Sequence, residues 1–254
     1  MDFKRHKIDV CGVEVDDISF KNAVENVLKL GRASSRGKYV VTINSEFVML
    51  ARRNSKFAQI LKNADLALPD GVGVVISKLI LGGKEHDRVT GVDLLENVCK
   101  VVCDKPVRIG LLGGFGGVAK DVAKRQKTRL TSLKVVIAEP GDPSPEADLR
   151  LKQRFLEIGR VDVLFVAYGM GKQEFWIDRM RKSLDVGVFI GVGGAFDYLA
   201  GIKKRAPVFM QNLGLEWLWR LLLDPVRIWR MRVLPEFFLL VVVKILKNKF
   251  PKIL

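Results

Sequence analysis

The sequence predicts an α/β fold made of two Rossmann-like lobes with mainly parallel sheets, followed by a basic, amphipathic helical C-terminal appendage. Short β-branched runs alternate along the chain with stretches in which apolar residues recur at helical spacing. The tail differs, because tryptophan and leucine are interleaved there with arginine. We therefore divide the chain into a core, residues 1–202, with lobes at about 1–105 and 106–202, and an appendage, residues 203–254.

The first lobe is predicted to open with a hairpin and a helix and to continue with two strand–helix units. Residues 8–15 alternate around a glycine, as in a hairpin, and Ser19 can cap the helix that follows. Residues 39–44 form a β-branched run typical of a buried strand, and residues 66–69 form a short apolar run that stops at a proline. Apolar residues at helical spacing follow both runs.

Polar residues stand where these two strands end. Thr42 and Asn44 close the first strand, and Asp70 comes directly after the second. Because ligands bind at the carboxyl ends of strands in open α/β sheets, we expect the three side chains to line one pocket. Two alternatives stay open: Asn44 can be a plain helix N-cap, and Asp70 can be a turn residue that caps the helix beginning near Val72.

Five further residues can contact a ligand at the same edge. Arg88 lies in a polar loop and suits a phosphate or a sugar. The turn at Gly113 and Gly114 follows a strand and precedes a helix, which lets backbone N–H groups approach a phosphate, although it is no strict G-x-G-x-x-G. Gln173 belongs to a cluster of Lys, Gln and Glu that follows another strand and precedes an amphipathic helix. Asp197 follows the last predicted strand, where its carboxylate can accept hydrogen bonds from ribose hydroxyls. Strands of the second lobe are predicted at 107–112, 134–138, 161–167 and 186–191.

The charge of the chain indicates a polyanionic partner. It carries 43 Lys and Arg against 28 Asp and Glu, a net charge of +15. Residues 203–254 hold eleven of the basic residues and only three acids. Their arginines alternate with apolar and aromatic residues, which favours a segment lying on anionic lipid; a solvated basic face on ordinary packing helices is the alternative. The chain has no known nucleic-acid-binding motif, so we expect no nucleic acid partner.

The composition also bears on location and on metals. No signal peptide is apparent, and the longest apolar run, residues 237–243, is far shorter than the roughly 20 residues of a spanning helix. Three cysteines suit a reducing compartment. We therefore expect a cytoplasmic protein, peripheral on the inner face of the cell membrane. With only two histidines in the chain, we expect Cys99 and Cys103 to pack in the core and not to bind a metal, and we expect no cofactor.

Six blocks, in order along the chain, resemble the WecG/TagA/CpsF glycosyltransferase family, also known as glycosyltransferase family 26. The resemblance covers about Ile8 to Pro235. The blocks are Thr42-x-Asn44-x-Glu46, Pro69-Asp70-Gly71, Arg88-Val89-Thr90-Gly91-x-Asp93, Lys172-Gln173-Glu174-x-Trp176, Gly191-x-Gly193-Gly194-x-Phe196-Asp197 and Lys204-Arg205-Ala206-Pro207, with Gly214-Leu215-Glu216-Trp217 after them.

The resemblance implies an inverting, metal-independent glycosyltransferase. It would move an N-acetylmannosamine-type sugar from a UDP donor to polyprenyl-diphosphate-linked GlcNAc, in the synthesis of teichoic acid, enterobacterial common antigen or a capsular polysaccharide. By the same resemblance Asp70 matches the general base, Gln173 a donor contact, and the appendage a segment that closes over the site and touches the membrane. Thr42, Asn44 and Arg88 match pocket residues, and Arg220, Arg227 and Arg230 match arginines that hold diphosphate.

Two positions depart from the family pattern, and one other function stays open. Ile43 replaces a usual proline, and Gly169-Met170-Gly171 stands where a small residue and a proline are commoner; both bear on donor preference. The alternative is a Rossmann-type oxidoreductase that uses the turn at Gly113 and Gly114. Whether the protein forms a homo-oligomer stays open.

Overall fold

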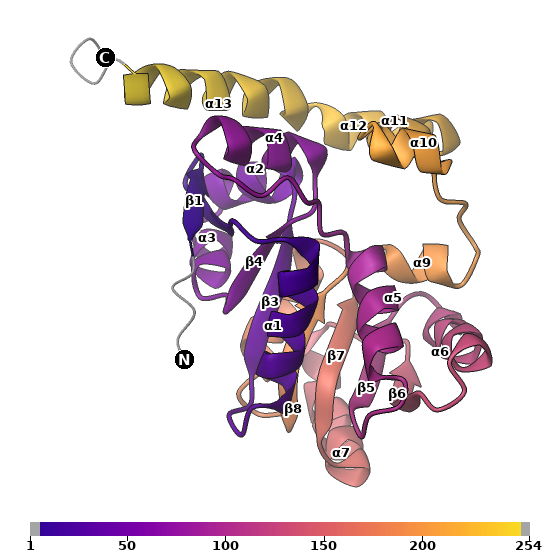
Figure 1. Cartoon of the computed structure of the whole chain (residues 1–254). Coiled ribbons are helices and arrows are strands. Elements are labelled where there is room, and N and C mark those ends of the chain that lie inside the picture. The colour runs from indigo at the N-terminus through magenta and orange to yellow at the C-terminus, as the bar shows by residue number, and fades with distance from the viewer. Residues whose placement is uncertain (1–5, 250–254) are drawn as a thin grey trace.

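The computed structural model describes residues 6–249 and is built on one six-stranded parallel sheet (Figure 1). The strand order is β4-β3-β8-β7-β5-β6, and every neighbouring pair is parallel. The strands are β3 (Lys38–Ile43), β4 (Leu66–Pro69), β5 (Arg108–Gly113), β6 (Lys134–Glu139), β7 (Val161–Ala167) and β8 (Val186–Gly191). The predicted α/β class with parallel strands and a helical C-terminal part is confirmed.

The two expected lobes share this sheet, which corrects the expectation of a separate sheet in each. Strand β3 of the first half pairs with β8 of the second, from Lys38 opposite Val188 to Val41 opposite Gly191. A separate first sheet of β3 and β4 would leave a long apolar strand edge unpaired, and main-chain pairing with β8 removes it. The sequence pattern marks both strands as buried but does not encode which strands become neighbours.

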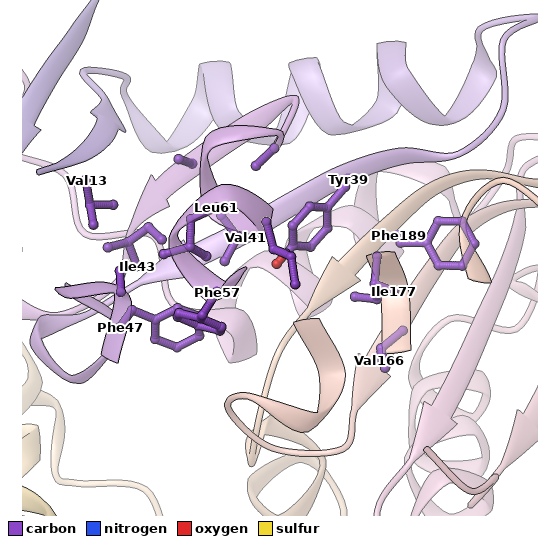
Figure 2. Packing of buried hydrophobic residues seen from close by; sticks show 14 of the residues in the cluster. Val13, Tyr39, Val41, Ile43, Phe47, Phe57, Leu61, Val166, Ile177 and Phe189 are labelled. Atoms are coloured by element: carbon purple, nitrogen blue, oxygen red, sulfur yellow. The ribbon is translucent and has the colours of Figure 1, made fainter. Parts of the chain in front are cut away.

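Helices cover both faces of the sheet, so that the core forms two layers of apolar packing. Neighbouring residues of a strand point to opposite faces: Val41 packs in one apolar cluster (Figure 2) and Val40 in the other. The cluster of Val41 includes side chains from α2 (Ser45–Arg53), α3 (Ser55–Lys62), α7 (Asp148–Ile158) and α8 (Lys172–Met180). The cluster of Val40 includes side chains from α1 (Phe20–Arg32), α5 (Gly91–Val102), α6 (Val118–Arg129) and α9 (Ala195–Leu199).

The predicted hairpin is present beside the edge strand β4. Strands β1 (Lys7–Val10) and β2 (Val13–Asp16) pair antiparallel, and the Asp16 carboxylate accepts a hydrogen bond from the Ala67 amide at 2.7 Å. Ser19 caps α1 by accepting from the Asn22 amide, as predicted. Helix α4 (Val72–Ile80) follows β4, and a short 3-10 turn, η1 (Pro145–Ala147), precedes α7.

The appendage is helical and lies across the carboxyl end of the sheet, above α2 and α4 (Figure 1). It contains α10 (Val208–Asn212), α11 (Glu216–Leu223), η2 (Pro225–Arg227), α12 (Ile228–Met231) and α13 (Val233–Lys249). The helices of the appendage are interrupted at Pro225, where η2 begins, and again just before Val233, where α13 begins. Pro235 fits into the first turn of α13, because the N–H that proline lacks has no partner there within the helix.

Helix α13 joins the core on one side and is open to solvent on the other. Phe237 is fully buried and Val241 is 4% exposed, both in the same cluster as Val41. Phe238, Leu239 and the other outward side chains are exposed. Within residues 6–249 no helix is long and apolar enough to cross a bilayer.

Candidate active site

A cavity of about 560 Å³ lies between the carboxyl end of the sheet and the appendage. This is the edge at which open α/β sheets bind ligands. Among the residues that line it are seven of those predicted from the sequence: Thr42, Asn44, Asp70, Arg88, Gln173, Arg220 and Arg230. Four elements of the core and two of the appendage thus bring these side chains to one place, as the sequence predicts.

Thr42 and Asn44 are held firmly where β3 ends. The Thr42 hydroxyl is buried and donates to the Gly191 carbonyl of β8 at 3.2 Å. The Asn44 side chain caps α2, since its Oδ1 accepts from the Phe47 amide at 3.2 Å. Asn44 is therefore a helix cap and a cavity residue at once, and the two interpretations do not exclude each other.

Asp70 does not cap α4, and among the side chains that the structure describes its carboxylate has no hydrogen-bond partner. Helix α4 begins after Gly71 without a side-chain cap, while the Asp70 amide donates to the Ile43 carbonyl at 2.9 Å and so fixes the backbone. Burial raises the pKa of Asp70 to about 6, although Arg220 and Arg88 lower it. A carboxyl group with this pKa is ionised at neutral pH and basic enough to accept a proton.

Gln173 and Glu174 are buried beside the glycine-rich end of β8. The Gln173 side chain accepts a hydrogen bond from the Gly193 amide at 2.9 Å, which fixes the loop after β8. Glu174 accepts from the Gly171 amide at 2.6 Å at the start of α8, and burial raises its pKa to about 7. A side chain at Gly191 would collide with Gln173, since a Cβ there would lie 2.6 Å from its amide nitrogen.

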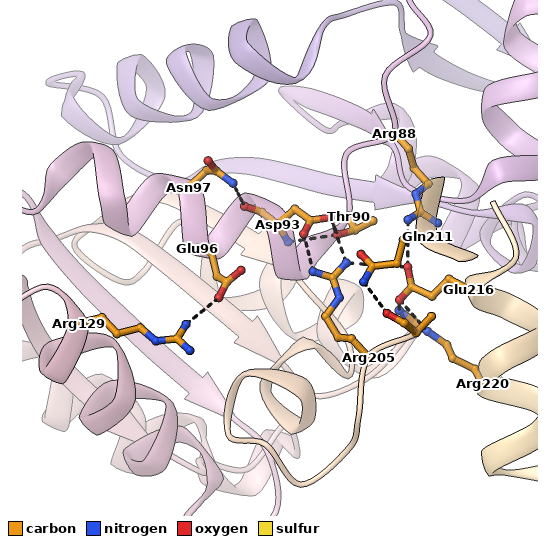
Figure 3. A network of polar contacts seen from close by, with 11 residues as sticks. Arg88, Thr90, Asp93, Glu96, Asn97, Arg129, Arg205, Gln211, Glu216 and Arg220 are labelled. Carbon is orange, nitrogen blue, oxygen red and sulfur yellow. Dashed lines mark hydrogen bonds and ion pairs between the residues drawn. The ribbon is translucent and has the colours of Figure 1, made fainter. Parts of the chain in front are cut away.

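Arginines and acids form a network of polar contacts (Figure 3). Arg88, Glu216 and Arg220 of this network line the same cavity as Asp70. Glu216, at the start of α11, accepts from Arg88 at 3.0 Å and from the Arg220 Nε at 3.2 Å. Arg205, in the segment before α10, pairs with Asp93 at 2.6 Å and lies 3.9 Å from Glu216. Residues from the core and the appendage thus form one network.

The remaining two arginines of the predicted diphosphate site lie at the next turn of the appendage. Arg230 lines the cavity and donates to Glu46 at 2.7 and 3.0 Å. The backbone of Arg227 belongs to η2, and its side chain lies outside the described residues.

Three predicted ligand residues are not among those that line the cavity. Gly113 and Gly114 adopt positive φ angles at the end of β5, where Gly113 packs on the Ala167 backbone and Gly114 packs on α6. The Asp197 carboxylate accepts from the Lys203 ammonium at 2.7 Å, so that Lys203, which does line the cavity, is held by Asp197. Ligand contacts of these three residues stay predictions.

Glu46, Tyr198, Lys203 and Glu216 are among the cavity residues to which the sequence assigned no role. Glu46 and Glu216 both stand inside the family blocks, so the signal was present. Their function lies in pairing with arginines of distant segments, which spacing along the chain does not show. Tyr198 and Lys203 lie in the stretch between two blocks.

The arrangement offers a base beside several cations. Asp70 is ionised at neutral pH, and Arg88, Arg220, Arg230 and Lys203 line the same cavity. Guanidinium groups suit phosphate oxygens because they present several N–H donors in a plane. Within residues 6–249 no three or more His, Cys, Asp or Glu side chains are grouped to hold a metal ion.

The chain is similar in sequence to known glycosyltransferases over most of its length. The model of the glycosyl transferase WecG/TagA/CpsF family matches residues 8–251. The chain is 32% identical over 219 residues to an N-acetylglucosaminyldiphosphoundecaprenol N-acetyl-β-D-mannosaminyltransferase of Bacillus subtilis, covering 85% of this chain and 84% of the relative. Proteins of the same name from Bacillus spizizenii and Staphylococcus aureus are 31% and 29% identical, over 80% and 91% of this chain and 78% and 90% of their own lengths. With a family match over nearly its whole length, the chain belongs to the WecG/TagA/CpsF family of glycosyltransferases.

Proposed function

We propose that the protein transfers an N-acetylmannosamine-type sugar from a UDP donor to polyprenyl-diphosphate-linked GlcNAc, with inversion at the anomeric carbon. The observation that carries the proposal is the placement of Asp70 in one cavity with Arg88 and Arg220. The relatives named above, whose name states a mannosaminyl transfer to a GlcNAc-diphosphoundecaprenol, support the substrate class. The product would enter the synthesis of a cell-surface polymer.

In the proposed reaction, Asp70 acts as the general base. Its carboxylate takes the proton from the attacking hydroxyl of the acceptor GlcNAc as the oxygen forms a bond to the anomeric carbon. The bond between that carbon and the UDP oxygen breaks on the opposite face, and UDP leaves with the electron pair. A single displacement of this kind inverts the anomeric configuration. The base needs a pKa below the working pH, and a pKa of about 6 meets that need.

The arginines of the appendage serve the acceptor in this proposal. Arg220 and Arg230 line the cavity, and the backbone of Arg227 lies between them in the chain. Together with Arg88 they would bind the lipid diphosphate and bring the GlcNAc hydroxyl to Asp70. Gln173, Thr42 and Asn44 would line the donor side, where β3, β7 and β8 end.

We also propose a peripheral position on the inner face of an anionic membrane, and the outer surface of the appendage supports contact with a membrane. Trp229, Leu222 and Leu223 are 61%, 66% and 55% exposed, on a segment that also carries an excess of basic residues. A segment with exposed apolar side chains and arginines is suited to the lipid interface. A lipid-linked acceptor would then reach the cavity directly from the bilayer surface.

The oxidoreductase alternative has no support among these relatives. The turn at Gly113 and Gly114, on which it depends, is not among the cavity residues. A titration with NAD(H) and with UDP separates the two activities. We expect UDP to bind and NAD(H) not to bind.

Mass spectrometry of the product tests the proposed transfer. The purified protein is incubated, in the presence of EDTA, with a panel of UDP-sugars and a short-chain lipid-diphosphate GlcNAc. We expect a mass increase of one N-acetylhexosamine residue with UDP-N-acetylmannosamine, and none with the Asp70→Asn variant. If no UDP-sugar of the panel extends the acceptor, the proposed reaction is wrong. If a UDP-hexuronic acid is the better donor, the reaction class stands and the donor is corrected.

A further inference from the structure

We infer that Glu216 is a positioning residue of the active site, which holds Arg88 and Arg220 in place to bind the acceptor diphosphate. The inference rests on the proposed function, because it assumes that these arginines bind the diphosphate. It assigns a role in catalysis to a carboxylate that would not itself touch the reacting atoms.

The contacts of Glu216 come from three separate segments of the chain. Arg88 belongs to the loop before α5, Arg205 to the segment before α10, and Arg220 to α11. The Glu216 side chain is only 4% exposed, and its two oxygens divide these partners: Oε2 accepts from Arg88 at 3.0 Å, and Oε1 accepts from Arg220. Arg205 lies at 3.9 Å from Oε2 and is bound mainly to Asp93.

The pairing leaves hydrogen-bond donors of both arginines for a ligand. A guanidinium group has five N–H donors. Arg88 donates to Glu216 through Nη2 alone, and Arg220 donates through Nε and Nη2. Within the described part of the chain, no hydrogen bond occupies Nη1 of either arginine, and both residues line the cavity. Arg220 also stacks over the Tyr198 ring at 4.8 Å, which fixes the plane of its guanidinium.

Electrostatics explains why the carboxylate is needed. Three guanidinium groups lie in a partly buried cluster, and like charges repel strongly where water is scarce. Although burial raises the pKa of Glu216, its contacts with Arg220 and Arg88 lower the pKa below the ordinary value, so the carboxylate stays charged at neutral pH. Without that charge, Arg88 and Arg220 would turn toward solvent and away from Asp70.

Other contacts attach the appendage to the core, so its attachment can be tested separately from the role of Glu216 in positioning Arg88 and Arg220. Phe237 of α13 is fully buried, and Glu236 pairs with Arg53 at the surface. Lys244 pairs with Asp9 at 2.5 Å on the far part of α13. None of these four polar residues lines the cavity. They therefore provide a matched control, because Glu236→Gln removes a carboxylate that pairs with an arginine across the same junction of core and appendage, without changing the charges at Asp70.

Kinetics of Glu216→Gln test the inference. The variant has the same shape but no charge, so we expect the acceptor KM to rise at least tenfold while the affinity for UDP changes less than twofold. Glu236→Gln is the control and should leave both values unchanged. Glu216→Asp keeps the charge with a shorter reach and should recover part of the lost acceptor affinity. It also replaces Glu216→Gln if the latter does not fold.

Arg220→Gln separates this inference from the proposed function. If Arg220→Gln raises the acceptor KM and neither Glu216 variant does, the positioning role is wrong and the diphosphate role of Arg220 stands. If Arg220→Gln leaves the acceptor KM unchanged, the diphosphate role itself is wrong. Glu216 acts partly through Arg220, so the effects of the two substitutions should not add. In the double variant Glu216→Gln with Arg220→Gln, we expect the part of the rise in acceptor KM that depends on Arg220 to be little larger than in Arg220→Gln alone. Parallel losses of UDP affinity and of thermal stability in Glu216→Gln would show a purely structural role and overturn the inference.

Discussion

Asp70 combines burial, nearby cations and a carboxylate without a hydrogen-bond partner among the described residues. Such a group is stabilised poorly when ionised, which is why its pKa rises from 3.8 to about 6. The folding of the protein therefore tolerates a charge that it would be more stable without. Active sites commonly carry such strain, because the chemistry needs the charged group there.

Replacing Asp70 with Asn should abolish transfer and stabilise the fold. A general base contributes roughly 10²- to 10⁴-fold, so we expect the rate to fall by at least a hundredfold with UDP affinity largely kept. At pH 7 the ionised Asp70 lowers the free energy of unfolding by about 3 kcal/mol, since its pKa rises from 3.8 to about 6 and each unit of pKa shift corresponds to about 1.4 kcal/mol. Product formation and urea unfolding at pH 7 measure both effects. Full activity in this variant would disprove the role of Asp70 as the base.

The rate should also depend on pH through Asp70. The carboxylate is the active form, so we expect kcat/KM to rise as the pH increases through about 6 and to level off above 7. Glu174 titrates in a similar pH range, because burial raises its pKa to about 7. Glu174→Gln is therefore the control, and the rise of kcat/KM near pH 6 should persist in this variant. A limb that disappears in Glu174→Gln would assign the titration to Glu174 instead.

At this scale the sequence revealed residue types better than partners. Asn44 was correctly considered as a cap and as a pocket residue, because both roles follow from its place after a strand. Glu216 stands in a family block, but the block does not indicate its role. Its partner Arg88 is 128 positions away in the sequence, and only the folded chain brings the two side chains together.

The loop between α4 and α5 is the element that carries Arg88, and Asp17 anchors it. Lys78 donates to Asp17 at 2.6 Å, and the amides of Lys84 and Glu85 donate at 2.8 and 3.0 Å. Burial alone would raise the pKa of Asp17, but these hydrogen bonds lower it to about 2. The stability that Asp17 provides is therefore present above its ordinary pKa of 3.8 and is lost as the pH falls through about 2.

Asp17→Asn should loosen this loop. Removing one partner of a buried ion pair leaves the other charge unpaired, so we expect a loss of about 3 kcal/mol at pH 7, measured by chemical unfolding. Because Arg88 lies at the end of the loop, the acceptor KM should rise as well. The double variant Asp17→Asn with Lys78→Met removes both charges and should be less destabilised than Asp17→Asn alone. A larger loss in the double variant would contradict this explanation.

For the elements, the sequence predicted the strands and most helix starts, and it was less informative about loops. The turn at Gly113 and Gly114 has the pattern of a nucleotide site, yet its glycines are explained by packing: Gly113 lies against the Ala167 backbone, where a Cβ would be 2.6 Å away. Close packing and phosphate binding select glycine alike. The sequence pattern cannot separate the two causes.

For the whole molecule, the exposed apolar side of the appendage should govern membrane binding. We expect the combined substitution of Leu222, Leu223 and Trp229 by Ser to reduce binding to anionic liposomes at least tenfold, since insertion of apolar side chains is lost while the charge is kept. Sedimentation with liposomes measures the bound fraction. Deleting the appendage is a poorer test, because Phe237 is part of the core.

The matched control for this experiment lies on α7, far from the appendage (Figure 1). Leu149 and Leu156 are 79% and 76% exposed there, and replacing both with Ser should leave liposome binding unchanged. If the control lowers binding as much as the appendage variant does, the membrane contacts a different face. If neither variant lowers binding, the proposal that apolar side chains of this part of the appendage insert into the membrane is wrong.

The single sheet is the feature of the whole molecule that the sequence did not reveal, and it has a consequence for synthesis of the chain. Strand β3 cannot pair with β8 until β8 has been synthesised, and residues 44–185 are synthesised in between. At about 5–20 residues per second this takes roughly 7–30 s on the ribosome. During that interval the nascent chain carries the apolar edge of β3 without its partner, which makes it a substrate for holding chaperones. A half-length fragment would keep that edge permanently, so the gene is not expected to yield a soluble product when cut at its midpoint.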